Sequence, residues 1–245
     1  MHTPELLTKQ QQFADAMARY NSSSKYQLFS SLIALSNIGL QSWLIVKMWP
    51  RFADLGFLQW VVVAGLILYL TDLLNGFVHM LMDNYGGYTG PAGPLVANFH
   101  LHHKTPLYKK RPVPVVYFFE TGSKIWLVAY LLILAVFIDQ ISSWTATLLV
   151  GIGVFSSLAE VSHYLNHTSR SPLVSALMKM GLLMSKKHHA KHHTRDNMNY
   201  AFLNGWSDPV LNRLARFLFS GYKKGTDQHF ENYGSGLSGK PVGER

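Results

Sequence analysis

Long apolar stretches, separated by short polar segments, dominate the first two thirds of the chain. Residues 29–48, 57–78 and 142–162 each supply the roughly 20 mostly apolar positions needed to cross a hydrocarbon layer of about 30 Å. A further stretch, 125–138, is short for a crossing, but residues 121–140 suffice if the Lys124 side chain extends to the membrane surface. The pattern predicts an all-α, polytopic membrane protein with about four transmembrane helices.

The distribution of basic residues predicts how these helices are oriented. Of the 22 Lys and Arg residues, only Lys47 and Arg51 lie on or near the side where the first two apolar stretches are connected, and four crossings place the other 20 on the opposite side. Positively charged loops tend to stay in the cytoplasm, so both termini are expected there, with the bacterial inner membrane favoured over an organelle membrane. This topology also explains the net charge of +9, and no nucleic-acid partner is expected.

The remaining segments are predicted to flank one membrane domain, residues 29–220. Residues 1–28 lack the continuous apolar core of a signal peptide, and their weak apolar stripe predicts an interfacial helix. The Gly- and Pro-rich residues 83–94 predict turns, residues 173–184 a short interfacial helix, and the polar residues 221–245 a flexible tail. The sequence contains no cysteine, which excludes disulfides and thiolate metal sites.

Histidines are concentrated in four short segments, and only His2 and His229 lie elsewhere. The segments are HMLMD at 79–83, FHLHH at 99–103, HYLNH at 163–167 and HHAKHH at 188–193. In the first and third, the outer residues are four positions apart and share a helical face at the end of a predicted span. The other two segments are expected to be loops. The second and fourth spans run in the same direction, so all four segments should meet at the cytoplasmic face.

These segments predict a metal site that none of them would predict alone. An isolated i, i+4 histidine pair is more often incidental, and the KKHHAKHH run alone could be a basic surface loop. Together they offer eight imidazoles and one carboxylate, which suits two ions; imidazole-rich sites favour Zn, Cu, Fe or Ni over Mg or Ca. The absence of an HExxH sequence argues against a zinc protease, and the position beside the bilayer points to iron and oxygen chemistry. The candidate ligands are His79, Asp83, His102, His103, His163, His167, His189, His192 and His193.

Two acidic residues, Asp72 and Glu160, share the helical faces of these ligands. Either carboxylate could orient a ligating imidazole from behind, and for each of them a hydrogen bond to a neighbouring helix is an equal alternative. Basic residues near the histidines could hold a lipid phosphate or dock an acidic electron donor, or serve topology alone. They are Lys104, Lys109, Lys110, Arg111, Lys186, Lys187 and Lys191.

The four segments resemble the histidine boxes of the membrane lipid desaturases, from about Asp72 to Leu211. This family includes plasmanylethanolamine desaturases and the plant plastid desaturase that makes trans-3-hexadecenoic acid on phosphatidylglycerol. Its boxes have the forms H-x-x-x-D, F-x-x-H-H, H-x-x-x-H and H-x-x-H-H, which the candidate ligands match together with Phe99. His100 is not required by the family pattern, and His188 matches only the animal enzyme, so both are possible extra ligands or outer partners. The resemblance implies two iron ions, O2, and two electrons from cytochrome b5 or a ferredoxin with its reductase.

The resemblance implies that the protein introduces a double bond into a chain of a membrane glycerophospholipid. The segments HMLMDNYG, HHKTP and MGLLMSKKHHAKHH resemble the plant acyl desaturase, whereas FFET, the doubled histidine and NGW at 204–206 resemble the plasmanyl enzyme. Acyl desaturation near the carboxyl end is favoured. The alternatives are formation of the plasmalogen vinyl ether and a related diiron hydroxylase. A metal-binding transporter or a b-type haem bundle would place its ionisable groups deeper in the membrane.

Overall fold

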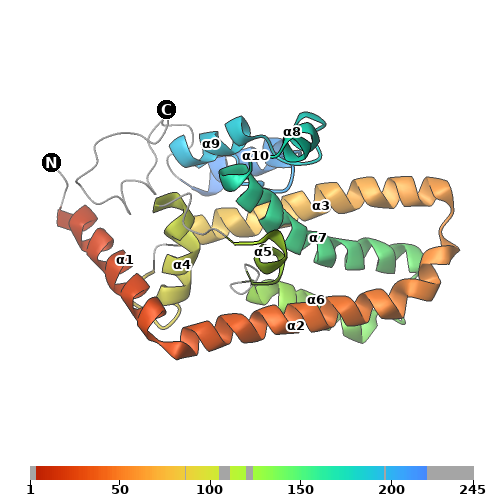
Figure 1. Cartoon of the computed structure of the whole chain (residues 1–245), viewed down its shortest axis with the longest axis horizontal. Coiled ribbons are helices and arrows are strands. Elements are labelled where there is room, and N and C mark those ends of the chain that lie inside the picture. The colour runs from red at the N-terminus through yellow and green to blue at the C-terminus, as the bar shows by residue number, and fades with distance from the viewer. Residues whose placement is uncertain (1–3, 86, 105–110, 120–123, 196, 220–245) are drawn as a thin grey trace.

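The computed structural model describes residues 4–85, 87–104, 111–119, 124–195 and 197–219, and every regular element in these ranges is a helix. The all-α class is therefore confirmed. Figure 1 shows the elements, which are α1 (Pro4–Ser22), α2 (Ser24–Met48), the 3-10 helix η1 (Trp49–Asp54), α3 (Phe57–Asp83), α4 (Gly93–Lys104), α5 (Val113–Phe119), α6 (Ile125–Phe137), α7 (Ser143–Thr168), α8 (Pro172–Lys179), α9 (Lys186–Thr194) and α10 (Asp208–Leu218). The predicted tail, His2, His229, Lys109 and Lys110 lie outside the described residues.

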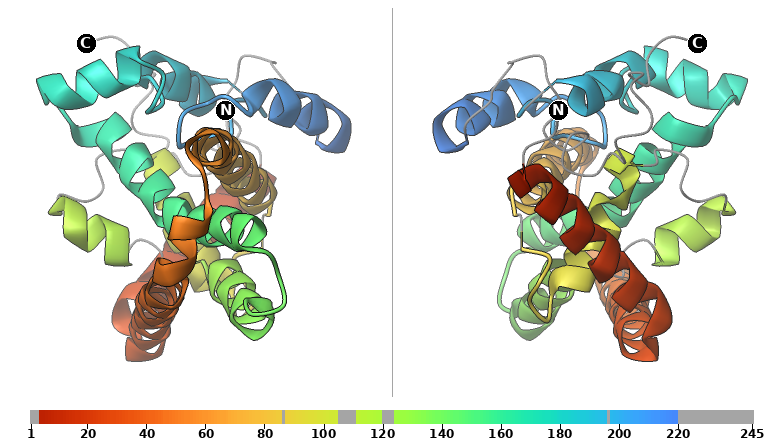
Figure 2. Two further views of the ribbon diagram at one scale, coloured as in Figure 1. Left: turned by 90° about the vertical axis from the view of Figure 1, so that its right-hand side faces the viewer. Right: turned by 90° about the vertical axis from the view of Figure 1, so that its left-hand side faces the viewer.

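Helices α2, α3, α6 and α7 form an elongated bundle (Figures 1 and 2). Three segments are long and apolar enough to cross a membrane: Ser24–Asp54, Phe57–Asp83 and Ser143–Thr168. Helices α3 and α7 approach closely, because a Cβ atom at Gly151 would lie only 2.2 Å from Cδ1 of Ile67. Both helices extend beyond the predicted apolar stretches, so their terminal histidine pairs remain helical.

The third predicted crossing differs from the expectation. Helix α6 has only 13 residues, and Lys124, at its start, is 7% exposed instead of reaching the membrane surface. Its Nζ donates to Asn75 Oδ1 and Ser156 O, each at 3.0 Å, and lies 2.8 Å from Glu160 Oε1. Burying an amine in this way requires such partners, because an unpaired charge in the protein interior is costly.

The described residues 111–119 and 124–138 nevertheless run antiparallel to α7, against its residues 149–164. Their contacts with α7 descend in order, from Arg111 with Tyr164, through Lys124 with Ser156, to Tyr130 OH with Leu149 O at 2.8 Å. Helix α6 covers residues 125–137 of the predicted stretch 121–140, and α5 lies before that stretch. Helix α6 is apolar but shorter than the three candidate spans, and the fourth crossing stays a prediction.

The N-terminal helix α1 packs on α4, beside one end of the bundle. Phe13 is 2% exposed and meets Tyr88 edge-to-face, with ring centroids 5.5 Å apart, while Arg19 donates to the Tyr88 carbonyl at 2.7 Å. The apolar stripe of this helix therefore covers α4. The predicted turns after Asp83 end at Gly93, where α4 begins.

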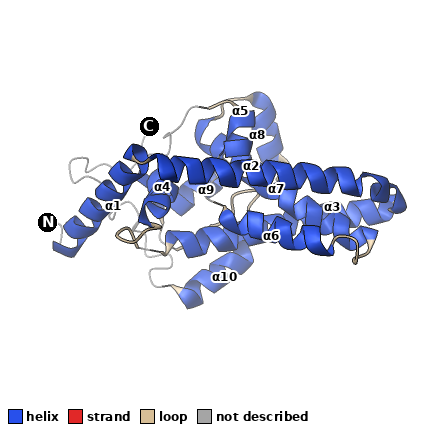
Figure 3. Ribbon diagram, turned by 90° about the horizontal axis from the view of Figure 1, so that it is seen from below, coloured by secondary structure: helices blue, strands red, loops and turns tan. Residues whose placement is uncertain are grey.

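Helices α8, α9 and α10 lie across the end of the bundle that carries the histidines (Figures 1 and 3). Helix α8 is shorter than predicted because Gly181 adopts a φ of 73°, a left-handed conformation that ends helices. Helix α10 packs on α3, with Leu211 and Ala215 against Met80. The three helices and their loops cover the last turns of α3 and α7.

Candidate metal centre

Helices α3, α4, α7 and α9 bring all nine predicted ligand residues together. Eight imidazoles form two adjoining sets, in each of which one ligand atom per residue lies within 4.8 Å of the others. We call them the inner group, consisting of His79, His102, His103 and His192, and the outer group, consisting of His163, His167, His189 and His193. The groups touch, because the rings of His103 and His193 are centred 4.8 Å apart.

The second and fourth histidine segments are helical, which corrects their prediction as loops. Helix α9 begins at a cap, where Ser185 Oγ accepts from the backbone N–H of His188 at 3.2 Å. The helical spacing then turns His189, His192 and His193 to one face and leaves Lys191 exposed. The segment has few apolar residues, so the spacing of apolar positions could not predict this helix.

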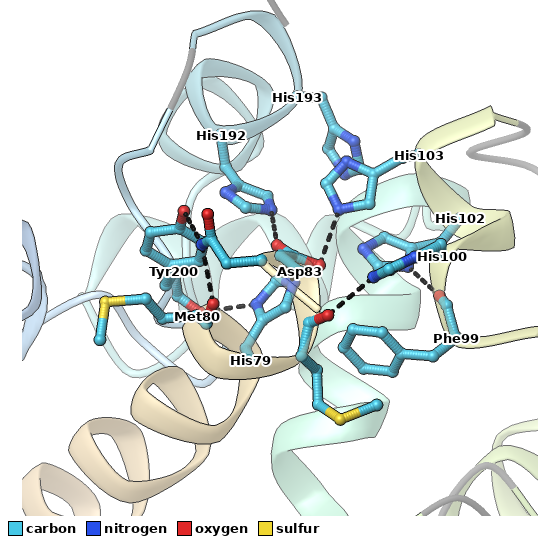
Figure 4. Close-up of polar contacts among 12 residues, drawn as sticks. His79, Met80, Asp83, Phe99, His100, His102, His103, His192, His193 and Tyr200 are labelled. Atoms are coloured by element: carbon cyan, nitrogen blue, oxygen red, sulfur yellow. Dashed lines mark hydrogen bonds and ion pairs between the residues drawn. The ribbon is translucent and has the colours of Figure 1, made fainter. Parts of the chain in front are cut away.

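The inner group surrounds the carboxylate of Asp83, as Figure 4 shows. Asp83 Oδ2 lies 3.1 Å from His79 Nε2 and 3.3 Å from His192 Nε2, and Oδ1 lies 3.2 Å from His103 Nε2. All these side chains are at most 2% exposed. A carboxylate buried among imidazoles is a suitable donor set for a divalent metal ion.

Backbone carbonyls orient the inner imidazoles. Nδ1 of His79 lies 2.8 Å from Tyr200 O, Nδ1 of His102 lies 2.7 Å from Phe99 O, and Nδ1 of His192 lies 3.0 Å from Met198 O. A carbonyl only accepts, so Nδ1 carries the proton in the neutral ring and the Nε2 lone pair faces the group. The buried Nε2 atom of His102 has no hydrogen-bond partner among the described residues, as expected of an atom that faces a metal.

The outer group is held by contacts between its own ring nitrogens. Nε2 of His167 lies 3.2 Å from Nε2 of His163 and 2.9 Å from Nε2 of His189, which lies 3.0 Å from Nε2 of His193. Such convergence of four nitrogens fits a shared ion. Behind His163, Glu160 Oε2 lies 3.9 Å from Nδ1, while Glu160 Oε1 forms the ion pair with Lys124. Glu160 thus takes the predicted place beside a ligand, and Lys124 is its partner, which sequence reasoning missed.

Burial favours the neutral form of three of these imidazoles. It lowers the pKa of His102, His189 and His193 well below the usual value of 6.5, and the neighbouring imidazoles lower each pKa further. These side chains are therefore neutral at neutral pH. The neutral ring is the form that binds metal ions.

Three predicted residues take other roles. His100 uses both ring nitrogens, with Tyr88 OH and Met82 O each at 2.8 Å, so it supports α4 and is not placed as a ligand. His188 lies outside both groups and pairs with Asp208, Nε2 to Oδ2 at 2.5 Å. Asp72 does not orient His79. Its carboxylate accepts from the backbone N–H groups of residues 203–205 and 207 and from Ser207 Oγ, which fixes that loop on α3.

The basic residues that were predicted to bind a lipid phosphate or an electron donor lie in different parts of the structure. Lys104 lies over the Phe13 ring at 5.4 Å, and Lys187 and Lys191 are exposed on α9. Arg111 and Lys186 line a cavity of about 890 Å³ that also reaches His167 of the outer group. A third cation in this lining, Arg170, was missed because it stands in a short turn with no histidine beside it.

Comparison with known proteins agrees with this geometry. The lipid desaturase domain family matches residues 68–220, which include every residue of both groups. Two Arabidopsis thaliana proteins, "Fatty acid desaturase 4-like 1, chloroplastic" and "Fatty acid desaturase 4, chloroplastic", are each 32% identical over 151 and 150 residues, 60% of this chain. The matches cover 50% and 46% of those proteins, so the chain spans about half their length. No solved structure matches the chain significantly. The family match extends over more than half of the chain, which therefore belongs to the lipid desaturase family.

Proposed function

We propose that the protein is a membrane lipid desaturase that uses two irons, O2 and two electrons to introduce a double bond into a membrane glycerophospholipid. The favoured product carries the double bond in an acyl chain, near its carboxyl end. One observation carries the proposal: two adjoining four-histidine groups, with a buried carboxylate, stand at one end of a bundle of apolar helices.

The two groups would hold one iron each, and Asp83 would complete the inner site. Iron with O2 would supply the oxidising power that no side chain has, since an alkyl C–H bond resists acid and base chemistry. In balance, two hydrogens leave neighbouring carbons, and O2 with two electrons and two further protons becomes two waters. The protein contributes fixed ligand positions, through the carbonyls behind His79, His102 and His192, and a dry surrounding.

The location of the cluster suits a phospholipid. Its members lie at the ends of α3 and α7, so a lipid headgroup can remain in water while the carbons next to it reach the histidines. We place this end, with both termini, on the cytoplasmic face, in a bacterial inner membrane, because the basic residues collect there. The electron donor would be cytochrome b5 or a ferredoxin with its reductase, docking on exposed lysines such as Lys187 and Lys191.

One specific observation weakens the likeness to the plasmanyl enzyme. The NGW segment at 204–206 belongs to the loop that Asp72 holds, and its Gly205 has a φ of 84°. The segment therefore has a structural reason to exist whatever the substrate is. The plant relatives are named as fatty acid desaturases, which favours acyl over alkyl-ether chemistry.

Purified protein and lipid extracts test the proposal together. We expect about two irons per chain, and loss of the unsaturated product in His102→Ala and His192→Ala. His188→Ala is the matched control, since this histidine lies outside both groups. Lipids from cells with and without the gene should differ by an acyl double bond. A vinyl ether or a hydroxylated chain would select one of the alternatives, and occupancy by zinc alone would reject the reaction.

A further inference from the structure

We propose that the cavity beside the outer group binds the phosphate of the substrate phospholipid through Arg111, Arg170 and Lys186. This inference rests on the proposed function and specifies where its substrate is held. The cavity, of about 890 Å³, lies where the start of α5, the end of α7 and the start of α9 meet. Figures 2 and 3 show α5 and α8 on the same side of α7, with α9 at the end of the bundle.

Contacts with the end of α7 position the segments that carry Arg111 and Lys186. Tyr164 OH accepts from the Arg111 backbone N–H at 3.0 Å and donates to its carbonyl at 2.9 Å, so the start of α5 is tied to α7. The Lys186 amine donates to the Ser169 carbonyl at the end of α7, next to Arg170. The three cations thus converge from separate elements, which a surface run of lysines would not do.

The lining has the charge and polarity of a lipid headgroup site. Among the described residues that line the cavity none is acidic, while Pro112 and Val113 add an apolar wall. Arginine and lysine side chains bind phosphate oxygens by charge-assisted hydrogen bonds. Basic residues beside an apolar wall suit an amphipathic molecule, which has a charged headgroup and apolar chains. An acidic protein partner would instead meet exposed cations such as Lys187 and Lys191, which lie outside the lining.

The position of His167 connects this cavity to the chemistry. His167 belongs both to the cavity lining and to the outer group. A phosphate held by the three cations therefore places the carbons nearest the headgroup beside the outer group, and the far end of the chain away from it. The geometry accounts for a reaction near the carboxyl end and for a substrate that is an intact phospholipid.

Binding of phosphatidic acid, compared with dioleoylglycerol, tests the inference. The two probes can carry the same chains and differ only in the phosphate. We expect Arg170→Glu in the full chain to weaken phosphatidic acid binding at least about tenfold, without changing dioleoylglycerol binding. Arg170→Lys keeps the charge and should bind like the wild type. Lys179→Glu, an exposed site on α8 outside the lining, is the matched control.

Activity gives an independent second readout. Arg170→Glu should raise KM for the phospholipid with little change in kcat, because it weakens binding without touching the ligands. Equal effects of Arg170→Glu and Lys179→Glu would overturn the inference. Tight binding of glycerol 3-phosphate would also overturn it, because the cavity would then bind a soluble phosphate ester. Slower reduction of Arg170→Glu by the electron donor, with unchanged lipid binding, would overturn it as well, because the cavity would then bind the donor.

The two proposals fail in different ways. Phosphate-dependent lipid binding that needs Arg170, in a protein that forms no unsaturated product, would remove the proposed function and leave the binding site. Desaturation that is indifferent to Arg170 and Arg111 would remove the binding site and leave the function.

Discussion

The inner and outer groups contain four imidazoles each, but the two groups differ in their surroundings. Every inner histidine is buried, a carboxylate stands among them, and backbone carbonyls fix three of their rings. In the outer group His167 and His193 are partly exposed, the rings contact one another, and His167 opens on the cavity. One half of the cluster is thus closed, and the other half adjoins the cavity.

This difference indicates a division of labour within one centre. A backbone carbonyl cannot change rotamer, so the inner rings are held in the orientation that a metal needs. The outer rings depend on one another and on the Glu160–Lys124 pair. We therefore expect the inner site to retain its metal more firmly, and the outer site to be more sensitive to change.

The largest effect is expected from His102→Ala, because His102 lies against both groups. Its ring centroid is 4.9 Å from that of His163 and 5.4 Å from that of His193. Its loss should lower metal content to near zero and activity by at least about 100-fold, measured by elemental analysis and product formation. Normal metal content in this variant would contradict the ligand assignment.

Loss of an outer histidine should be milder for the metal and separates the two groups. His167→Ala is expected to leave about one metal per chain, since the inner group keeps all its donors. Elemental analysis and a thermal melt of the same sample provide the measurement. Loss of both metals would mean that the groups act as a single unit, and the comparison above would not hold.

Changes to the buried Lys124–Glu160 pair behind His163 should affect both stability and metal affinity. Glu160→Gln leaves the Lys124 charge, 7% exposed, without its partner, which should cost about 3–5 kcal/mol of stability. Outer metal affinity should fall about 10-fold. The double variant Lys124→Met/Glu160→Gln removes both charges and should recover most of the stability, but not the affinity, in denaturant unfolding and metal titration.

Acidification should weaken the metal-free protein. The folded-state pKa of His102, His189 and His193 lies well below the unfolded value of 6.5, so below about pH 6.5 the unfolded chain binds more protons. Stability is fully present above that pH and falls as the pH decreases toward the folded pKa. Thermal melts between pH 8 and 5 should show this fall, and metal-loaded protein should resist it until protons displace the ions.

The smallest effect is expected at His188, which lies in α9 with three of the ligand histidines but outside both groups. His188→Gln should change metal content and activity less than about twofold, and lower stability by about 1–3 kcal/mol through its buried partner Asp208. Product assays and unfolding curves provide the comparison. A large loss of metal would add His188 to the centre.

The sequence predicts which residues meet better than it predicts the elements that carry them. The pairs His79/Asp83 and His163/His167 follow from helical spacing at the ends of apolar spans, and the structure brings them together. Helix α9 was missed because its polar sequence lacks an apolar stripe. Helix α4 was missed because it is short and begins with Gly93 and Pro94, which belong to a segment that predicts turns.

The roles of other residues could not be predicted from the sequence, because their partners are distant along the chain. Lys124 reads as an interfacial residue until Asn75, Ser156 and Glu160 are seen around its amine. Asp72 lies seven positions before His79, which suggested contact, but its hydrogen bonds go to a loop more than 130 residues later. Only tertiary structure decides between a carboxylate that serves a ligand and one that serves a loop.

Helix α9 has a consequence for how the enzyme matures. It donates His192 to the inner group and His189 and His193 to the outer group, so neither group is complete without it. A ribosome must therefore finish the four ligand-bearing helices before either ion can be fully coordinated. A metal ion held by either group would therefore be acquired late in biogenesis, and it would join α9 to the ends of α3, α4 and α7.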